Sequence, residues 1–361
     1  MSGINDTGVN CTGLYDHRHV ARVLIPIYYS FVFIVGFLGN MLALYVIVTH
    51  RTKINSTTLY SANLAASDIL FTISLPLRAV YYGLGFHWPL RETLCKITSL
   101  LFYLNTYAGV NFMTCLAVDR FIAIVLPRHF GKLQNVRKVQ NVRFVCLTVW
   151  LLVLAQTLPL LSMPMIHQEP DGSITCMEYP NFEGAIPGLP YMLIGAVVLG
   201  YGIPVVTILT CYSVLWHKLR SLARDNTVTE KLGRSQKAIG VIAGVVLVFL
   251  VCFTPYHIDL LQFMIRKLVY QPSCSELQYF QVSLHITVCL MNLNSCLDPF
   301  VYFFACKGYK RQLLSILKRK GKIYSASHMS RDSSSYIQGD SANSHRIRLS
   351  SLRNSLQILN E

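Results

Sequence analysis

The sequence predicts an all-α membrane protein: a bundle of seven transmembrane helices with a short amphipathic helix on the inner membrane surface. Of the 361 residues, 53% are hydrophobic and only 14% are charged, whereas a soluble domain carries about 25% charged residues. Seven apolar stretches are each long enough to cross a hydrocarbon core of ~30 Å, which takes roughly 20 residues. Lys and Arg collect between alternate stretches, as in loops that stay on the cytoplasmic side.

Each apolar stretch is expected to be a helix, because a backbone N–H or C=O group without a partner is very costly in lipid. Asn55 is expected to open the second span rather than to carry a glycan. A large soluble helical protein is disfavoured, because apolar runs of this length rarely occur together in a water-soluble chain. The bundle is expected over residues 23–304. Its spans are predicted at about residues 23–49, 56–82, 92–126, 143–165, 189–217, 236–266 and 277–304.

The distribution of charge sets the expected orientation. Residues 127–143 carry five Lys or Arg and no acid, and residues 217–237 carry six against two acids. Residues 165–188 carry four acids and no Lys or Arg. The N-terminal segment before the first span is therefore expected outside the cell, where Asn5 and Asn10 match the pattern for N-glycosylation. The net charge of +15 then reflects topology and attraction to anionic inner-leaflet lipid, which explains it better than nucleic-acid binding does.

Four of the eleven cysteines fall in segments that are expected outside, namely Cys11, Cys95, Cys176 and Cys274. Disulfides form and persist in the oxidising exterior, whereas cytosolic thiols stay reduced. The sequence therefore predicts two disulfides among these four residues. Three pairings are possible in principle.

Ionisable and amide side chains occur inside the predicted spans. Asp68 lies in the second span and Asp298 in the seventh, near Asn294 and Ser295. An ionisable residue at membrane depth is costly and usually functional, so this polar core is predicted to hold water or a small cation. The sequence does not establish a metal site, but it makes Asp68 a candidate ligand for sodium. Alternatively, Asp68 and Asp298 are buried protonated acids without a function. Asn40 in the first span is expected to join helices through hydrogen bonds.

Seven spans with an N-terminus outside the cell are compatible with three classes of protein. These are a signalling receptor, a light-driven pump, and a transporter or channel. A retinal pump needs a lysine in the last span, and none occurs between Lys267 and Lys307. Transporters usually show internal repeats, and the chain shows none. Its histidines are scattered, without a catalytic constellation, so neither an enzyme nor a cofactor is expected.

The chain resembles the class A, rhodopsin-like G-protein-coupled receptors over about residues 23–318. Any one of the matching motifs is weak, but together they occur in order, at least one in each span. They are Gly39-Asn40, Leu64-Ala65-Ala66-Ser67-Asp68, Cys95, Asp119-Arg120-Phe121, Trp150 with Pro159, Pro204 with Tyr212, Cys252-Phe253-Thr254-Pro255-Tyr256, and Asp298-Pro299-Phe300-Val301-Tyr302. The resemblance implies a heterotrimeric G protein, receptor kinases and arrestin as partners. It also implies the disulfides Cys95–Cys176 and Cys11–Cys274.

The resemblance implies an activation switch at the cytoplasmic end of the third span. There Asp119 holds Arg120 in the resting receptor. On activation Arg120 extends toward Tyr212 and Tyr302 and contacts the G protein. An ion pair at a membrane edge suits a switch, because small helix motions change its hydrogen-bond partners.

Prolines are expected to kink the moving helices, since they break backbone hydrogen bonds. Pro255 would let the inner end of the sixth span swing outward, and Pro299 acts similarly in the seventh.

The sequence also departs from the family. Phe253 replaces the commonest Trp, Asp298 replaces the commonest Asn, and Gly109 replaces a hydroxyl residue near the acid of the second span. These departures bear on sodium binding.

The segment after the bundle divides in two. In residues 305–318, apolar and basic side chains alternate at near-helical spacing, which predicts the amphipathic helix. Residues 319–361 are rich in serine and poor in apolar residues, so a disordered cytoplasmic tail is expected. Ser333, Ser334 and Ser335 form a candidate kinase cluster, whose phosphates would create an acidic patch for arrestin; a plain solvated tail is the alternative.

The outer half of the bundle suggests the ligand. Phe102 stands where amine receptors of the family carry an Asp, so an amine is disfavoured. Tyr103 and Tyr107 share one helix face, and Tyr256 and Arg78 lie in other spans at this level. Three phenols and one guanidinium suit a bulky apolar ligand that carries hydroxyl groups or one anionic head. Interhelical hydrogen bonds are the alternative role of the tyrosines.

A closer resemblance concerns the oxysterol-sensing chemotactic receptors of this class. It is carried by strings such as NTYAGVNFMTCL (residues 105–116), SLHITVCLMNLN (283–294) and FFACKGYKR (303–311). It implies that the ligand is a dihydroxylated cholesterol, such as 7α,25-dihydroxycholesterol. The residues that would bind this ligand are Arg78, Tyr103, Tyr107 and Tyr256. It further implies an inhibitory-class G protein, immune-cell migration and the plasma membrane. A chemokine, peptide or other lipid receptor is the alternative, and a salt bridge with Asp259 is the structural alternative for Arg78.

Overall fold

A computed structural model of the chain describes residues 17–49, 54–126, 134–169, 172–177, 188–225, 229–270, 272–305 and 313–315. The chain divides into two compact units, residues 1–310 and 311–361. Of the second unit, only the helical residues 313–315 are described. The predicted amphipathic helix therefore lies largely outside the described residues, as do Asn5, Asn10 and Ser333 to Ser335.

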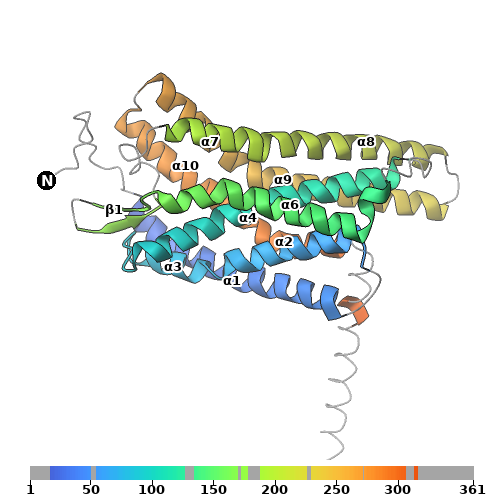
Figure 1. Cartoon of the computed structure of the whole chain (residues 1–361), viewed down its shortest axis with the longest axis horizontal. Helices are drawn as coiled ribbons and strands as arrows, with labels where there is room; N and C mark the ends of the chain where they lie inside the picture. Colours follow the sequence, from blue (N-terminus) through green and yellow to red (C-terminus); the bar gives the residue numbers. More distant parts are fainter. Residues whose placement is uncertain are drawn as a thin grey trace, which may run out of the picture. The chain divides into compact units, whose positions relative to one another are not determined.

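The first unit is the predicted helical bundle. Its described residues contain seven helical segments that are long and apolar enough to cross a membrane, and Figure 1 shows them packed side by side. The segments are α1 (Arg18–Thr49); α2 (Ser56–Thr72) with α3 (Leu75–Gly83); α4 (Glu92–Ile124); α6 (Val139–Thr157) with η2 (Leu158–Ser162); α7 (Leu189–Val197), η4 (Val198–Gly202) and α8 (Ile203–Asp225); α9 (Thr229–Val269); and α10 (Cys274–Asn292) with α11 (Asn294–Ala305).

The second span consists of two helices, α2 and α3. Asn55 caps the start of α2 by accepting a hydrogen bond from the N–H of Thr58 at 2.9 Å, as expected for the residue that opens this span. The helix then breaks, because Pro76 has no N–H to donate. Ser74 donates its backbone N–H (2.9 Å) and its hydroxyl (2.7 Å) to the carbonyl oxygen of Phe71, and α3 starts afresh with Arg78 in its second turn.

The fifth span contains a π-helical segment, η4, between α7 and α8. A π segment inserts one residue into a helical turn and occurs frequently at functional sites. Pro204 follows η4 at the second position of α8, where its missing N–H interrupts the regular helical bonding. Gly200 and Tyr201 of η4 are both buried. The π segment was not predicted from the sequence.

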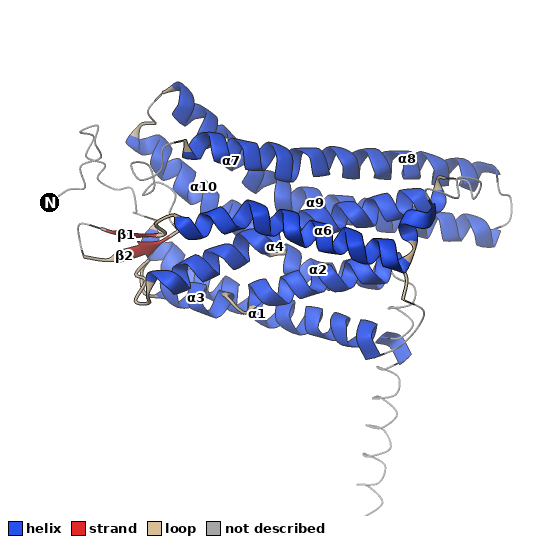
Figure 2. Cartoon of the chain, in the orientation of Figure 1, coloured by secondary structure: helices blue, strands red, loops and turns tan. Residues whose placement is uncertain are grey.

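One end of the bundle carries a two-stranded antiparallel hairpin, β1 (Ile166–Gln168) with β2 (Ile174–Cys176), which Figure 2 shows in red. We call this the hairpin end. The predicted disulfide Cys95–Cys176 is present and fastens β2 to the start of α4. Cys274 is also disulfide-bonded. Its expected partner Cys11 lies outside the described residues, so that pairing stays a prediction.

The polar residues of the bundle lie in its interior, while its outer surface is apolar. Asn40 is fully buried and donates to the carbonyl oxygens of Gly36 (2.9 Å) and Ser295 (2.8 Å), so it joins α1 to α11. Large apolar side chains such as Phe144 (70% exposed) point outward. This arrangement suits a bundle that is surrounded by lipid.

Candidate functional site

A small cavity at the hairpin end lies between helices α1, α2, α3, α4, α9 and α10 and the end of the hairpin. It encloses about 40 Å³. Two of the four predicted ligand residues, Arg78 and Tyr256, line it together. The lining also includes Tyr29, Phe71, Ser74, Leu75, Tyr82, Thr98, Phe102, Met177, Leu284, His285, Val288 and Asn292. The cavity is therefore mostly apolar, with one guanidinium and several phenol, hydroxyl, imidazole and amide groups.

Arg78 is held at the cavity by the hairpin. Its side chain is buried, donates to the carbonyl oxygen of Cys176 at 3.4 Å and contacts the sulfur of Met177. Met177 has a positive φ of 65°, which is uncommon for a residue other than glycine. Among the described residues, Arg78 forms no salt bridge with Asp259, whose carboxylate accepts a hydrogen bond from Ser283 at 2.9 Å.

The other two predicted tyrosines do not line this cavity. Tyr103 packs edge-on against Phe102, with ring centroids 5.2 Å apart. Tyr107 lies against η4: a Cβ atom added at Gly200 would be 2.7 Å from Cε1 of Tyr107. Instead, Phe102 contributes an apolar wall from α4.

Sequence reasoning missed Met177 and His285 as cavity residues. Met177 follows the disulfide-bonded Cys176 directly, and that position was the available signal. His285 sits on α10 and lines the cavity beside Leu284. Its ring lies 5.6 Å from that of Tyr82. Nothing in the local sequence distinguishes it from a histidine at the bundle surface.

The polar core lies deeper in the bundle, and the structure brings its predicted members together. Ser295 donates to Asp68 at 3.0 Å, and Asn294 donates to Asp298 at 3.0 Å. The two carboxyl groups, both fully buried, also interact with each other. Within the described residues, Oδ1 of Asn294 has no hydrogen-bond partner. A Cβ atom added at Gly109 would lie 3.9 Å from Nδ2 of Asn294. Gly109 is therefore close to the polar core, but it provides no hydroxyl group there. Sodium at Asp68 thus stays a prediction.

The predicted switch lies at the opposite end of the bundle, which we call the Arg120 end. Asp119 is 2% exposed and accepts a hydrogen bond from Nε of Arg137 at 2.8 Å. Its two oxygens also accept from the hydroxyls of Ser56 (2.5 Å) and Thr57 (2.9 Å). The Asp119 carboxylate is therefore held by groups from α2 and by η1 (Asn135–Arg137). These partners of Asp119 were not predicted from the sequence.

Arg120 lies half-buried beside Asp119. Its guanidinium is close enough to the hydroxyl of Tyr212, on α8, to interact electrostatically. Tyr302 is buried on α11. Phe253 is buried on α9 and approaches Gly109, with 3.5 Å between its Cζ and an added Cβ. Pro255 and Pro299 lie inside α9 and α11, respectively.

Comparison with known proteins identifies relatives for this arrangement. The family described as "7 transmembrane receptor (rhodopsin family)" matches residues 39–302. G-protein coupled receptor 183 of Salmo salar is 65% identical over 350 residues, which are 97% of this chain and 94% of that protein. G-protein coupled receptor 183-B of Danio rerio is 70% identical over 309 residues, 86% of this chain and 83% of that protein. G-protein coupled receptor 183 of Homo sapiens is 54% identical over 316 residues, 87% and 86% respectively. These relatives are receptors rather than enzymes.

Proposed function

Because the chain belongs to the rhodopsin family of seven-transmembrane, G-protein-coupled receptors, we propose that it responds to a hydroxylated cholesterol. The ligand is an oxysterol such as 7α,25-dihydroxycholesterol. The receptor couples mainly to inhibitory-class G proteins and directs immune-cell migration. It lies in the plasma membrane with its N-terminus and hairpin end outside.

The observation that supports this proposal is the placement of Arg78 and Tyr256 on one apolar cavity. A sterol is a rigid hydrocarbon with few hydroxyl groups, so its site needs apolar walls and a small number of well-placed polar groups. Phe71, Phe102 and Leu284 supply such walls. The guanidinium of Arg78 offers donors, and the phenol of Tyr256 can donate or accept. Arg78 is fixed by the hairpin, which lowers the cost of ordering it when a ligand binds.

The cavity must widen to admit a sterol. It encloses about 40 Å³, whereas pockets for small molecules usually measure about 300–1,000 Å³. Binding therefore selects a conformer in which the helices around the cavity are further apart. Tyr256 lies next to Pro255 in α9, so a sterol at the hairpin end acts directly on the proline-containing helix. Displacement of α9 then opens the Arg120 end to the G protein.

Other parts of the proposal concern residues outside the described ranges. Asn5 and Asn10 carry glycans, and Cys11 forms the second disulfide with Cys274. Receptor kinases phosphorylate the cluster Ser333 to Ser335, to which arrestin then binds. These assignments rest on sequence patterns and on the resemblance.

The test is G-protein activation by hydroxylated sterols in cells that express the full chain. Replacing Arg78 by Ala removes a buried, charged hydrogen-bond donor, which is worth roughly 1.5–3 kcal/mol. We therefore expect about a 10- to 100-fold loss of sterol potency. Arg22→Ala is the matched control: Arg22 is exposed and donates to the carbonyl oxygen of Gly83 at the same end, and its removal should leave potency unchanged.

Two outcomes contradict the proposal. If no hydroxylated sterol activates any G protein while a chemokine or peptide does, the ligand class is wrong. If sterols activate but only stimulatory-class biosensors respond, the sterol assignment stands and the inhibitory coupling is wrong.

A further inference from the structure

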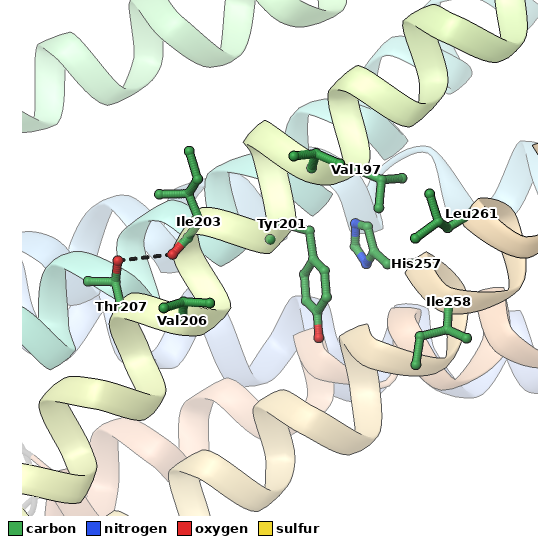
Figure 3. A pocket seen from close by; sticks show the side chains of 10 residues that line it. Val197, Tyr201, Ile203, Val206, Thr207, His257, Ile258 and Leu261 are labelled. Atoms are coloured by element: carbon green, nitrogen blue, oxygen red, sulfur yellow. Dashed lines mark hydrogen bonds between the residues drawn. The ribbon is translucent and has the colours of Figure 1, made fainter. Parts of the chain in front are cut away.

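A second concave site lies between the fifth and sixth spans, on the outside of the bundle. Helices α7, η4 and α8 form one wall and α9 forms the other, and the groove encloses about 540 Å³ (Figure 3). Its rim is apolar and faces outward: Val206 is 64% exposed, Ile203 58% and Ile258 48%. In a membrane-spanning receptor such a rim faces lipid.

The floor of the groove contains two polar side chains, unlike its rim. Tyr201 and His257 are both buried and stack face to face, with ring centroids 4.1 Å apart and planes 9° apart. Figure 3 shows the imidazole between Tyr201 and Leu261, beneath the helix that carries Val197. The Tyr201 hydroxyl is satisfied, because it shares a hydrogen bond of 2.6 Å with the hydroxyl of Thr254.

His257 has one satisfied nitrogen and one unsatisfied nitrogen. Nδ1 lies 2.8 Å from the carbonyl oxygen of Phe253. A carbonyl oxygen can only accept, so Nδ1 carries the proton and Nε2 of the neutral ring is an acceptor. Among the described residues, Nε2 has no hydrogen-bond partner. A buried polar group without a partner is costly, and a hydroxyl donor would relieve that cost.

The depth of His257 limits which lipid can supply the hydroxyl. Nine residues of α9 separate it from Arg266, where the predicted sixth span ends, which is about 14 Å at 1.5 Å per residue. That is nearly half of a hydrocarbon core ~30 Å thick, so His257 lies near the middle of the membrane. Headgroups stay at the membrane surface and acyl chains carry no donor. The hydroxyl must therefore belong to the apolar tail of the lipid.

The groove is also close to the proposed ligand cavity. The ring of His257 packs edge-on against Tyr256, with centroids 5.1 Å apart, and against Tyr107 at 6.4 Å. Tyr256 lines the cavity, whereas His257 lines the groove. Two consecutive residues of α9 thus face two different sites.

We propose that the groove is a second, membrane-facing subsite for a side-chain-hydroxylated sterol, whose tail hydroxyl donates to Nε2 of His257. This inference deepens the proposed function and rests on it for the sterol class. Nε2 is buried, so apolar side chains that line the groove move aside when the hydroxyl enters.

The test is photolabelling of the full chain in lipid nanodiscs, with labelled residues mapped by mass spectrometry. Two photoreactive sterols are compared, which differ only in the tail hydroxyl. We expect the hydroxylated probe to label residues 197–207 and 257–261. His257→Leu should reduce this labelling by about three- to tenfold, the equivalent of one lost hydrogen bond. Labelling by the probe without the hydroxyl should not change.

A steric variant tests the groove without touching the imidazole. Gly202 lines the groove, and a Cβ atom added there meets only the carbonyl oxygen of Val197, at 3.8 Å. Gly202→Leu should therefore fill the groove and abolish labelling of its walls. Gly195→Leu is the matched control, because an added Cβ at Gly195 has no neighbour within 4 Å and Gly195 does not line the groove.

Equal labelling of the groove by both sterols, or labelling that His257→Leu leaves unchanged, would show that lipid fills the groove without recognition. Either result overturns the inference, as does labelling that is confined to the cavity around Arg78. The last result would leave the proposed function intact. Conversely, hydroxyl-dependent labelling of the groove without any sterol-stimulated G-protein activation would overturn the proposed function alone.

Discussion

At the residue scale, the environment of Asp119 is the most informative feature of the Arg120 end. A carboxylate that is 2% exposed needs several partners. Here it has Arg137 and the hydroxyls of Ser56 and Thr57. These groups supply one cation and two hydroxyl donors to Asp119, while the guanidinium of the adjacent Arg120 interacts electrostatically with Tyr212. We therefore expect Arg137 and Arg120 to compete for the Asp119 carboxylate when the receptor switches.

Replacing Arg137 by Ala tests this competition. The buried carboxylate loses its cation, which should cost about 1–3 kcal/mol and lower the melting temperature of the detergent-solubilised receptor. We expect the adjacent Arg120 to be drawn toward Asp119 in its place. We expect lower agonist-stimulated G-protein activation, measured in membranes at matched receptor density.

Lys138→Ala is the control, since Lys138 follows Arg137 and is exposed. It should change neither the melting temperature nor G-protein activation. If Arg137→Ala destabilises the receptor but leaves activation unchanged or raises it, Arg120 does not compete for Asp119.

At the scale of elements, η4 determines how the fifth span meets α4. The π segment places Gly200 directly against the ring of Tyr107, where a Cβ would lie 2.7 Å from Cε1 and 2.9 Å from Cδ1. Such distances are shorter than van der Waals contact between carbon atoms. The same segment turns Tyr201 inward onto His257. One element therefore shapes both the packing of Tyr107 and the floor of the groove.

Gly200→Ala should be destabilising, although alanine favours a helix. The added methyl group must displace a buried aromatic ring, and such overpacking typically costs about 1–3 kcal/mol. We expect a lower melting temperature and a weaker sterol response. Gly195→Ala, on α7 with open space around it, should be neutral or stabilising by up to about 1 kcal/mol. Equal melting temperatures for the two variants would show that Tyr107 does not pack tightly on η4.

At the scale of the whole molecule, the small cavity and the long proline-containing helix determine how the receptor responds. The cavity lies between α3 and α10, among other helices, and about 40 Å³ cannot hold a sterol. Its ligand must separate these helices. Since α9 also lines the cavity through Tyr256 and continues toward the Arg120 end, widening at one end can be transmitted to the other.

Spin labels can measure this widening. Leu84 at the end of α3 and Tyr279 on α10 are exposed, at 49% and 81%, and accept labels without disturbing the core. On addition of a hydroxylated sterol, we expect their separation to increase by roughly 1–2 Å, as in helix shifts of other switching proteins, measured by double electron–electron resonance. Arg78→Ala should abolish the change at the same sterol concentration. An unchanged distance in the receptor that carries Arg78, at saturating sterol, would contradict the proposed widening.

Three features can be read from the amino-acid sequence alone: the number and order of the spans, the disulfide-forming cysteines at the hairpin end, and the polar groups that gather in the core. These follow from hydrophobicity, charge and motif order, which are properties of the chain read in one dimension. Asn40 joins α1 to α11 as expected, and Asp68 meets Asp298.

Which groups meet across the bundle, in contrast, depends on how the helices pack in three dimensions. The i, i+4 spacing placed Tyr103 and Tyr107 on one face of α4, but which neighbour that face meets depends on how α4 packs against η4. Likewise, Asp119 forms an ion pair with Arg137, because the fold returns η1 to the end of α4. Side-chain direction and long-range pairing depend on packing between distant segments, and no local pattern in the chain encodes them.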